Sequence, residues 1–404
     1  MIHQKKGSSI IDVFLDVQDE RSMRNLISYA RQNELTDSEV LSLAVGLSQS
    51  GEVINILEGT SLYDIPSTGG PTSLSTLLCP LFLALTGRKV LKLGVPGRPA
   101  GGIDVLAQIE GYNIAPNTNL ISRWLQNYNY VHFIVAENIA SLDGKLFRFR
   151  RENDAIDIPS LAIASLLSKK IAVGLSHVGL DVRVSDFGNF GKNWNEAIRN
   201  ATRFNRISAL AGIYSQCFLT DGNAPQQPYI GRGESILALQ KLFMGQADPW
   251  LEGHVDTCFK MSAMLTDGRM NKYSISELAD YFFKNVVLQA GSKKSFDQIA
   301  SLTIDGHKDT IKAAQNGVLK IDLKTVRDAI VAVQNRCSGA FPDPCGIILR
   351  KAANSYVSKN DDLCTIRCVE KYKKEFAESL KAAFYFVPQP INYKDLEIIT
   401  NGKV

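Results

Sequence analysis

Apolar positions change their spacing along the chain, and the two spacings predict an alternation of helices and strands. The run from Val40 to Leu47 has the three-to-four-residue spacing of a helix, and it ends at Gly51. Thr36 and Glu39, just before it, have the spacing of a capping box. Short continuous apolar runs between glycines or polar residues predict strands instead.

The chain up to about Gly51 is therefore expected to be helical. Further helices are expected at 74–85, 104–110, 159–173, repeatedly between 233 and 284, and at 369–383. Strands are expected at 89–93, 130–135, 180–184, 207–218, 317–322, 345–349 and 363–366. Strands that alternate with helices favour an α/β core with a mixed, mainly parallel sheet. The short strands after about residue 317 favour a small α+β module.

A glycine- and hydroxyl-rich segment, Ser67-Thr68-Gly69-Gly70-Pro71-Thr72-Ser73, lies directly before the apolar helix at 74–85. Such backbone can turn tightly and aim N–H groups at an anion, and the helix adds its positive dipole end. The segment lacks the lysine of a nucleoside-triphosphate loop. An ordinary loop is the alternative to a phosphate site. The candidate phosphate ligands are Ser67, Thr68, Gly69, Gly70, Ser75 and Thr76.

A second candidate site lies on the helix expected at 159–173. Ser165 and Lys169 are four residues apart, so both lie on one face of that helix. Arg150 belongs to a basic run that precedes the helix. Taken alone, such residues usually belong to a solvated surface, which is the alternative to a binding site.

Composition limits the classes of partner. The 404 residues carry a net charge of only +4 and are 45% hydrophobic, which is ordinary for a globular protein and favours neither a nucleic-acid nor a membrane partner. No apolar run reaches the roughly 20 residues of a membrane span, and the N-terminus lacks a secretory apolar core, so a cytoplasmic location is expected. The seven cysteines have no zinc-site spacing, so reduced thiols and no metal are expected.

Taken together, these stretches resemble the pyrimidine nucleoside phosphorylase (thymidine phosphorylase) family and, more distantly, anthranilate phosphoribosyltransferase. The resemblance runs from about Leu35 to about Tyr385, and an arginine fifteen residues before Ser165 is part of it. Its landmarks are Leu35-Thr36-Asp37-Ser38-Glu39, Ser50-Gly51-Glu52-Val53-Ile54, Asp64-x-x-Ser67-Thr68-Gly69-Gly70, Ala164-Ser165-Leu166-Leu167-Ser168-Lys169-Lys170 and Asp343-Pro344-Cys345-Gly346-Ile347.

This resemblance implies three domains and a homodimer. Residues 1–60 and 142–173 would form a helical domain, and residues 61–141 and 174–316 a large α/β domain that carries the phosphate loop. Residues 317–404 would form the C-terminal α+β module. Substrates would be held across a cleft that closes by domain motion.

The resemblance also implies an activity, the reversible phosphorolysis of a pyrimidine nucleoside or deoxynucleoside to free base and pentose 1-phosphate. Arg150, Ser165 and Lys169 would bind the base and stabilise its departure as an anion. Inorganic phosphate would be the co-substrate, with no other cofactor. Which pyrimidine and which pentose are used stays open.

The chain departs from the family at the phosphate site. Ile65 and Pro66 occupy the positions of the family's Lys-His pair, so a cation and a candidate acid are missing. Lys92, at the end of an expected strand, and Arg98, in the loop after it, are the expected replacement cations for phosphate. A surface lysine and a loop charge are the alternatives for these two residues.

Two other functions are compatible with these departures. The chain could be a phosphoribosyl-type transferase or a nucleotide-acting phosphorylase, which Lys92 favours. It could also be a non-catalytic nucleoside- or nucleotide-binding protein, which the missing Lys-His pair favours.

Overall fold

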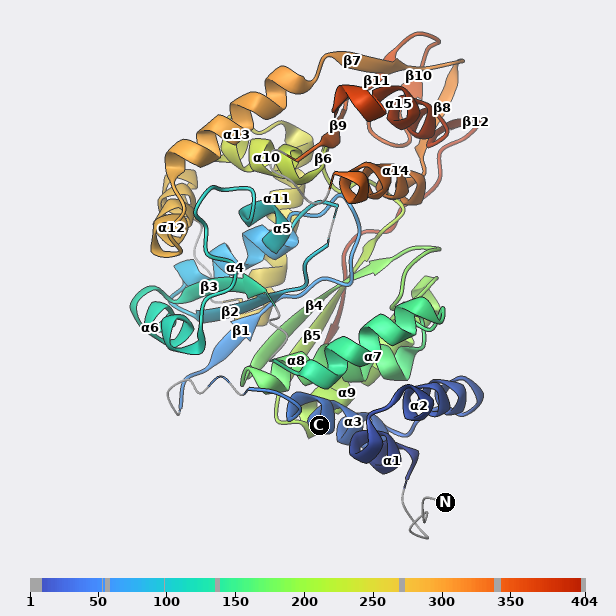
Figure 1. The fold of residues 1–404 in the computed structure, drawn as a ribbon. Helices are drawn as coiled ribbons and strands as arrows, with labels where there is room; N and C mark the ends of the chain where they lie inside the picture. Colours follow the sequence, from blue (N-terminus) through green and yellow to red (C-terminus); the bar gives the residue numbers. More distant parts are fainter. Residues whose placement is uncertain are drawn as a thin grey trace.

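The computed structural model describes residues 9–52, 54, 59–97, 99–134, 139–268, 273–337 and 343–400. A six-stranded sheet with the strand order β13-β5-β4-β1-β2-β3 lies at its centre (Figure 1). All neighbouring pairs are parallel except β13 with β5. The expected α/β fold with a mixed, mainly parallel sheet is confirmed. The strands are β1 Leu62–Asp64, β2 Lys89–Gly94, β3 Tyr130–Ile134, β4 His177–Val184, β5 Tyr214–Asp221 and β13 Glu397–Thr400.

Helices from the first half of the chain cover one face of this sheet. Alternate residues of β4, among them Val178 and Leu180, point into the core that these helices share with the sheet. The capping box is present, since Glu39 N donates to Thr36 Oγ1 at 3.2 Å and Thr36 N donates to Glu39 Oε2 at 2.7 Å. The helices are α1 Ile10–Val17, α2 Glu20–Gln32, α3 Asp37–Ser48, α6 Thr118–Tyr128, α7 Ser141–Glu152, α8 Pro159–Ala172 and α9 Trp194–Leu210.

A second group of helices packs against the other face of the sheet. Their core includes Tyr63 and Ile65 from the β1 region and Phe218 from β5. The helices are α4 Ser75–Leu85, α5 Ile103–Leu106, α10 Arg232–Phe243, α11 Pro249–Leu265, α12 Ile275–Leu288 and α13 Lys293–Gly306. None of the described helices is both long and apolar enough to cross a membrane.

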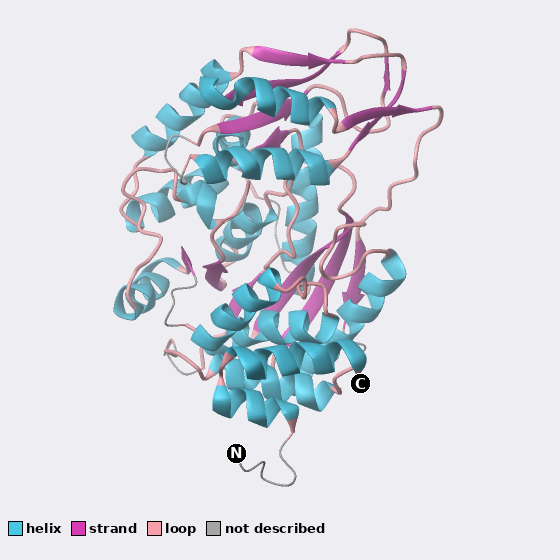
Figure 2. Cartoon of the chain, turned by 45° about the vertical axis from the view of Figure 1, so that its right-hand side comes forward, coloured by secondary structure: helices cyan, strands magenta, loops and turns pink. Residues whose placement is uncertain are grey.

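The C-terminal part forms two small sheets with their own core, at the end of the molecule opposite the N-terminal helices (Figure 2). The sheets have the orders β10-β8-β12 and β6-β9-β11-β7. After them the chain returns to the large sheet, where β13 pairs with β5. The elements are β6 Tyr229–Ile230, β7 Asp309–Lys312, β8 Gly317–Ile321, α14 Leu323–Arg336, β9 Cys345–Leu349, β10 Tyr356–Val357, β11 Asp362–Cys368, the 3-10 helix η1 Glu370–Tyr372, α15 Lys373–Lys381 and β12 Phe384–Val387.

Two expected elements differ from the structure. The strand expected at 207–218 is wrong in its first half, because α9 continues to Leu210 and β5 begins only at Tyr214. Gly212, with φ +74°, lies in the turn between them. The apolar run at 207–218 therefore belongs first to the buried face of α9 and then to the buried strand β5. The helix expected at 104–110 is α5 and ends at Leu106, where turns follow.

The seven cysteines are free thiols and five of them are buried, as expected. The proposed division into three domains stays a prediction, and residue 135, expected in a strand, lies outside the described residues.

Candidate active site

A cavity of about 590 Å³ is lined by the two expected sites together. The glycine-rich loop before α4 and the loop after β2 line it on one side, and α7 and α8 line it on the other. Arg98 lies outside the described residues. The expected site residues that line the cavity are Ser67, Thr68, Gly69, Gly70, Ser75, Thr76, Lys92, Arg150, Ser165 and Lys169.

The glycine-rich loop is held against β4 by its own backbone. Thr68 N donates to the carbonyl of Asp181 at 2.9 Å, and Thr68 Oγ1 accepts from Arg183 N at 2.9 Å. Gly69 and Gly70 follow with φ values of 134° and 99°, a region that side chains rarely adopt. The sequence therefore needs glycine here, and the turn brings bare backbone to the cavity.

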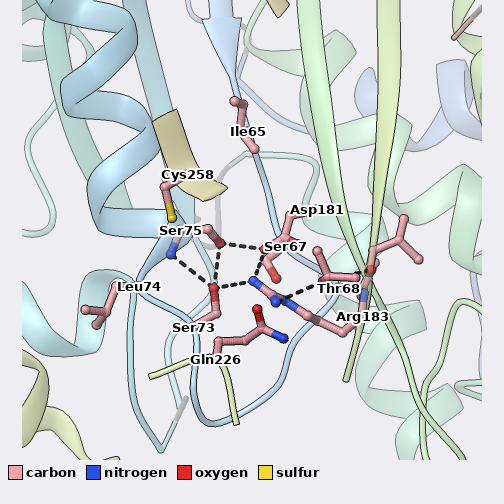
Figure 3. A network of polar contacts seen from close by, with 12 residues as sticks. Ile65, Ser67, Thr68, Ser73, Leu74, Ser75, Asp181, Arg183, Gln226 and Cys258 are labelled. Atoms are coloured by element: carbon pink, nitrogen blue, oxygen red, sulfur yellow. Dashed lines mark hydrogen bonds and ion pairs between the residues drawn. The ribbon is translucent and has the colours of Figure 1, made fainter. Parts of the chain in front are cut away.

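A buried polar network lies behind this loop (Figure 3). Ser75 Oγ donates to Asp181 Oδ2 at 2.6 Å and accepts from Ser73 Oγ at 2.9 Å. Arg183 Nη2 donates to the same Asp181 oxygen at 2.7 Å. The hydroxyl hydrogen of Ser75 is therefore already used at the start of α4. A phosphate role for Ser75 stays a prediction and requires that hydrogen to change partner.

Two lysines share one buried carboxylate beside the loop. Lys92 Nζ donates to Asp64 Oδ1 at 2.8 Å and to the carbonyl of Ile65 at 2.7 Å, and Lys170 Nζ donates to Asp64 Oδ2 at 2.5 Å. Burial opposes ionisation of Asp64, but the two lysines outweigh it and hold its pKa below the usual value. Burial also lowers the pKa of Lys92, against the attraction of Asp64. Two cations and one anion leave one net positive charge next to the cavity that Lys92 and Lys170 line.

At the other end of the cavity, Lys169 joins α7 to α8. Its Nζ donates to Ser165 Oγ at 3.1 Å, to the Ser165 carbonyl at 2.9 Å and to Asp143 Oδ2. Asp143 also lines the cavity, and its Oδ1 is buried with no hydrogen-bond partner among the described residues. Asp143 was not among the residues expected from the sequence, although it lies seven residues before Arg150 and so on the same face of α7. This end offers a carboxylate acceptor next to hydroxyl and ammonium donors.

Arg150 is held by the backbone that connects α7 to α8. Its guanidinium donates to the carbonyls of Ala155 at 2.9 Å, Ile156 at 2.8 Å and Leu161 at 3.1 Å. Burial is the largest effect on Arg150 and lowers its pKa to about 10. Three of its five N–H groups thus shape the turn, and a contact with the base would use the remaining two.

The comparisons with known proteins agree with the resemblance seen in the sequence. No protein-family model matches the chain. The thymidine phosphorylase of Sinorhizobium medicae (strain WSM419) is 30% identical over 200 residues, which cover 47% of this chain and 44% of that protein. The thymidine phosphorylase of Agrobacterium fabrum (strain C58 / ATCC 33970) is 29% identical over 53% of this chain and 50% of that protein. The chain spans about half the length of these two relatives.

A longer match is found with the thymidine phosphorylase of Colwellia psychrerythraea (strain 34H / ATCC BAA-681), which is 24% identical over 76% of this chain and 74% of that protein. Among solved structures, the anthranilate phosphoribosyltransferase of Thermus thermophilus has a TM-score of 0.43 at 13% identity and covers 73% of this chain. That alignment covers 99% of the Thermus chain. The expected resemblance to the thymidine phosphorylases is therefore confirmed.

Proposed function

We propose that this divergent relative of the thymidine phosphorylases is a pentosyl transferase that splits a pyrimidine nucleoside or deoxynucleoside with phosphate. The proposal rests on one shared cavity. The residues expected to hold phosphate and the residues expected to hold a base line the same space. Ser67 and Lys169 are more than one hundred positions apart in the sequence, so their common cavity is a consequence of the fold.

At the phosphate end, the backbone around Gly69 and Gly70 and the first turn of α4 would hold the anion. Lys92 and Lys170 would supply the positive charge that the substituted positions Ile65 and Pro66 lack. Because Asp64 already takes one of their two charges, the site would hold phosphate with less electrostatic attraction than two free lysines would give. An oxygen of this phosphate would attack C1′ of the sugar.

At the base end, the bond between C1′ and N1 would break and its electron pair would stay on the base. Ser165 would donate its hydroxyl hydrogen to an oxygen of the departing base, where the negative charge develops. Lys169 would do the same by exchanging one of its three present acceptors on Ser165 and Asp143 for a base oxygen. Asp143 Oδ1, which is buried and unpaired among the described residues, would accept the N3–H of a uracil or thymine ring. Protonation of the base anion and release of pentose 1-phosphate would complete the reaction.

A panel of nucleosides tests the proposal. Uridine, thymidine, cytidine and inosine are each incubated with the protein, with and without inorganic phosphate, and free base is separated by chromatography. Uracil or thymine should appear only when phosphate is present. Absence of base from every pyrimidine nucleoside would reject the proposal. The Lys169→Met variant is the matched control, because it keeps the aliphatic stem but not the ammonium group.

A second function, ligand binding without turnover, is favoured by one observation. Lys92, Lys169 and Arg150 all have intramolecular hydrogen-bond acceptors. A sensor would then show thermal stabilisation by uridine or uridine monophosphate and no free base in the panel above. A phosphoribosyl-type or nucleotide-acting enzyme would instead release base from the monophosphate. The homodimer, the cytoplasmic location and phosphate as the only co-substrate stay predictions.

A further inference from the structure

His132 is a buried histidine on the wall of the cavity. It lies on β3 directly opposite Lys92 of β2, and both residues line the cavity. Its neighbours Val131 and Phe133 belong to the core on the first face of the sheet, so His132 points away from that core by strand alternation. No sequence motif predicted a role for this histidine.

All of the hydrogen-bonding groups of His132 have partners except one. Its backbone N donates to Gln289 Oε1 at 3.0 Å, and its carbonyl accepts from Gln289 Nε2 at 2.8 Å. The ring atom Nδ1 lies 3.1 Å from the hydroxyl oxygen of Tyr130. The ring atom Nε2 is buried and has no partner among the residues that the structure describes. A buried nitrogen without a partner is unfavourable, so its retention in a wall of a cavity points to a ligand.

The residue beside His132 Nε2 on the neighbouring strand is Gly94, which has no side chain. Gly94 lines the cavity, and a Cβ atom there would lie 3.3 Å from His132 Nε2 and 2.7 Å from Ile103 Cβ. Position 94 therefore has no room for a side chain, because Ile103 packs directly against it beside His132 Nε2.

The surroundings determine which charge such a ligand carries. Burial first, and Lys92 second, lower the pKa of His132 to about 3, so the imidazole is neutral at neutral pH. Lys92 and Lys170 line the cavity, and together with the buried Asp64 carboxylate between them they carry one net positive charge. A ligand anion is attracted there and a cation is repelled. When the Tyr130 hydroxyl donates to Nδ1, the remaining ring hydrogen is on Nε2, where it can be donated to an anionic oxygen.

We infer that His132 Nε2 is a ligand-binding atom that donates to an oxygen of a phosphate group. The phosphate is either inorganic phosphate or the phosphate of a phosphorylated pentose, since both present the same oxygens. Tyr130 is a positioning residue that selects the ring tautomer. The inference deepens the proposed function and rests on it for the identity of the anion. His132 would thus be a hydrogen-bond donor to phosphate on β3, a strand on which the sequence motifs predicted no phosphate-binding residue.

Titration of inorganic phosphate by calorimetry tests the inference on the full chain. In the double variant Tyr130→Phe/His132→Phe, both the ring donor and its partner are replaced by apolar groups of similar shape. We expect its Kd for inorganic phosphate to rise about tenfold, which corresponds to one hydrogen bond to a charged oxygen. Its free energy of unfolding without phosphate should stay equal or increase, because an unpaired buried nitrogen has been removed. A structural role would give the opposite result for stability.

A matched control is His177→Phe. His177 is at the start of β4, stacks on Tyr63 and does not line the cavity, so this variant should bind phosphate with an unchanged Kd. A parallel titration with ribose 1-phosphate separates the two sources of phosphate. A rise in Kd for only one of them identifies the ligand.

The result that would overturn the inference is an unchanged Kd for both phosphates in the double variant, or a loss of binding that merely follows a loss of folding. Failure of the proposed function is a separate result. A protein that releases no base from any nucleoside, but whose phosphate binding weakens in the double variant, retains the inference and rejects the proposed activity. A protein that releases uracil, but whose Kd for phosphate is unchanged in the double variant, supports the proposed activity and rejects the inference.

Discussion

Lys92 and Asp64 form a buried ion pair, with Lys92 Nζ 2.8 Å from Asp64 Oδ1, beside the loop that was expected to bind phosphate. The replacement cation expected from the sequence is present, but part of its charge is compensated inside the protein. The Asp64 carboxylate also holds Lys170 at 2.5 Å, so it connects β1, β2 and α8 at one point. Substitutions at this carboxylate are therefore expected to change both stability and the proposed phosphate affinity.

The Lys92→Met variant should separate these two effects. Its free energy of unfolding should fall by about 3 kcal/mol, because the buried acceptors Asp64 Oδ1 and Ile65 O lose their donor while Lys170 still balances the carboxylate charge. Its Kd for phosphate should also rise by roughly tenfold, as expected when a charged partner is lost. Urea denaturation and calorimetry measure the two quantities.

The double variant Asp64→Asn/Lys92→Met should regain neither stability nor phosphate affinity, because the buried Lys170 ammonium then has no carboxylate partner. Lys293→Met is the control: its exposed pair with Asp297 should contribute no more than about 0.5 kcal/mol. An unchanged phosphate Kd in Lys92→Met would show that Lys92 is only structural.

Asp143→Asn should change which ligands bind at the base end. The buried Oδ1 would no longer be a carboxylate acceptor for an N3–H group, so kcat/KM for uridine should fall by about ten- to one-hundredfold. Release of uracil, followed by chromatography, measures this. Asp157→Asn, which removes an exposed partner of Lys192, should leave the rate unchanged. Equal rates in the wild type and in Asp143→Asn would mean that Asp143 only orients Lys169.

Arg150→Met should destabilise the connection between α7 and α8. Three backbone carbonyls that accept from Arg150 would be left without their donor in a buried place, at a combined cost of about 3 kcal/mol. Arg151→Met, which alters an exposed neighbour, should cost less than about 0.5 kcal/mol. If Arg150→Met unfolded at the same urea concentration as the wild type but lost turnover, a direct role at the base would replace the structural one.

The pH dependence of stability should reflect the buried histidines. Burial, and after it Lys92 for His132 and Arg183 for His254, lower the pKa of each to about 3. Between pH 3 and the unfolded value of about 6.5 the unfolded chain binds more protons than the folded chain. Stability must therefore rise with pH across this window and be lost as the pH falls.

Each of these two histidines contributes a slope of up to about 1.4 kcal/mol per pH unit. In Tyr130→Phe/His132→Phe the slope, measured by urea denaturation from about pH 4.5 to 7, should fall by the contribution of one histidine. A slope equal to that of the wild type would mean that His132 is already protonated in the folded protein.

Local patterns predicted the two halves of the cavity for identifiable reasons. The glycine-rich loop can be recognised in the sequence because the positive φ values at Gly69 and Gly70 require glycine. Ser165 and Lys169 are visible because four residues separate neighbours on a helix face. The apolar spacings likewise predicted the strands β2, β3 and β4 and part of β5, but neither β1 nor β13.

The remaining features depend on contacts between distant parts of the chain. Asp64 and Lys170 are 106 positions apart in the sequence, and no local sequence pattern predicts their contact. His132 owes its place in the cavity to its pairing with Lys92 on the next strand. The carbonyls bound by Arg150 lie in the connection between α7 and α8 and at the start of α8, whose path follows from packing, so the arginine was expected at the base alone.

The strand β13 gives the protein a particular order of assembly. The ribosome makes β5 long before β13, yet β13 is the strand that covers the outer edge of β5. Until then, the nascent sheet has an exposed edge whose backbone groups can pair with another chain. A chain that lacks β13 would therefore be open to pairing with other chains at β5.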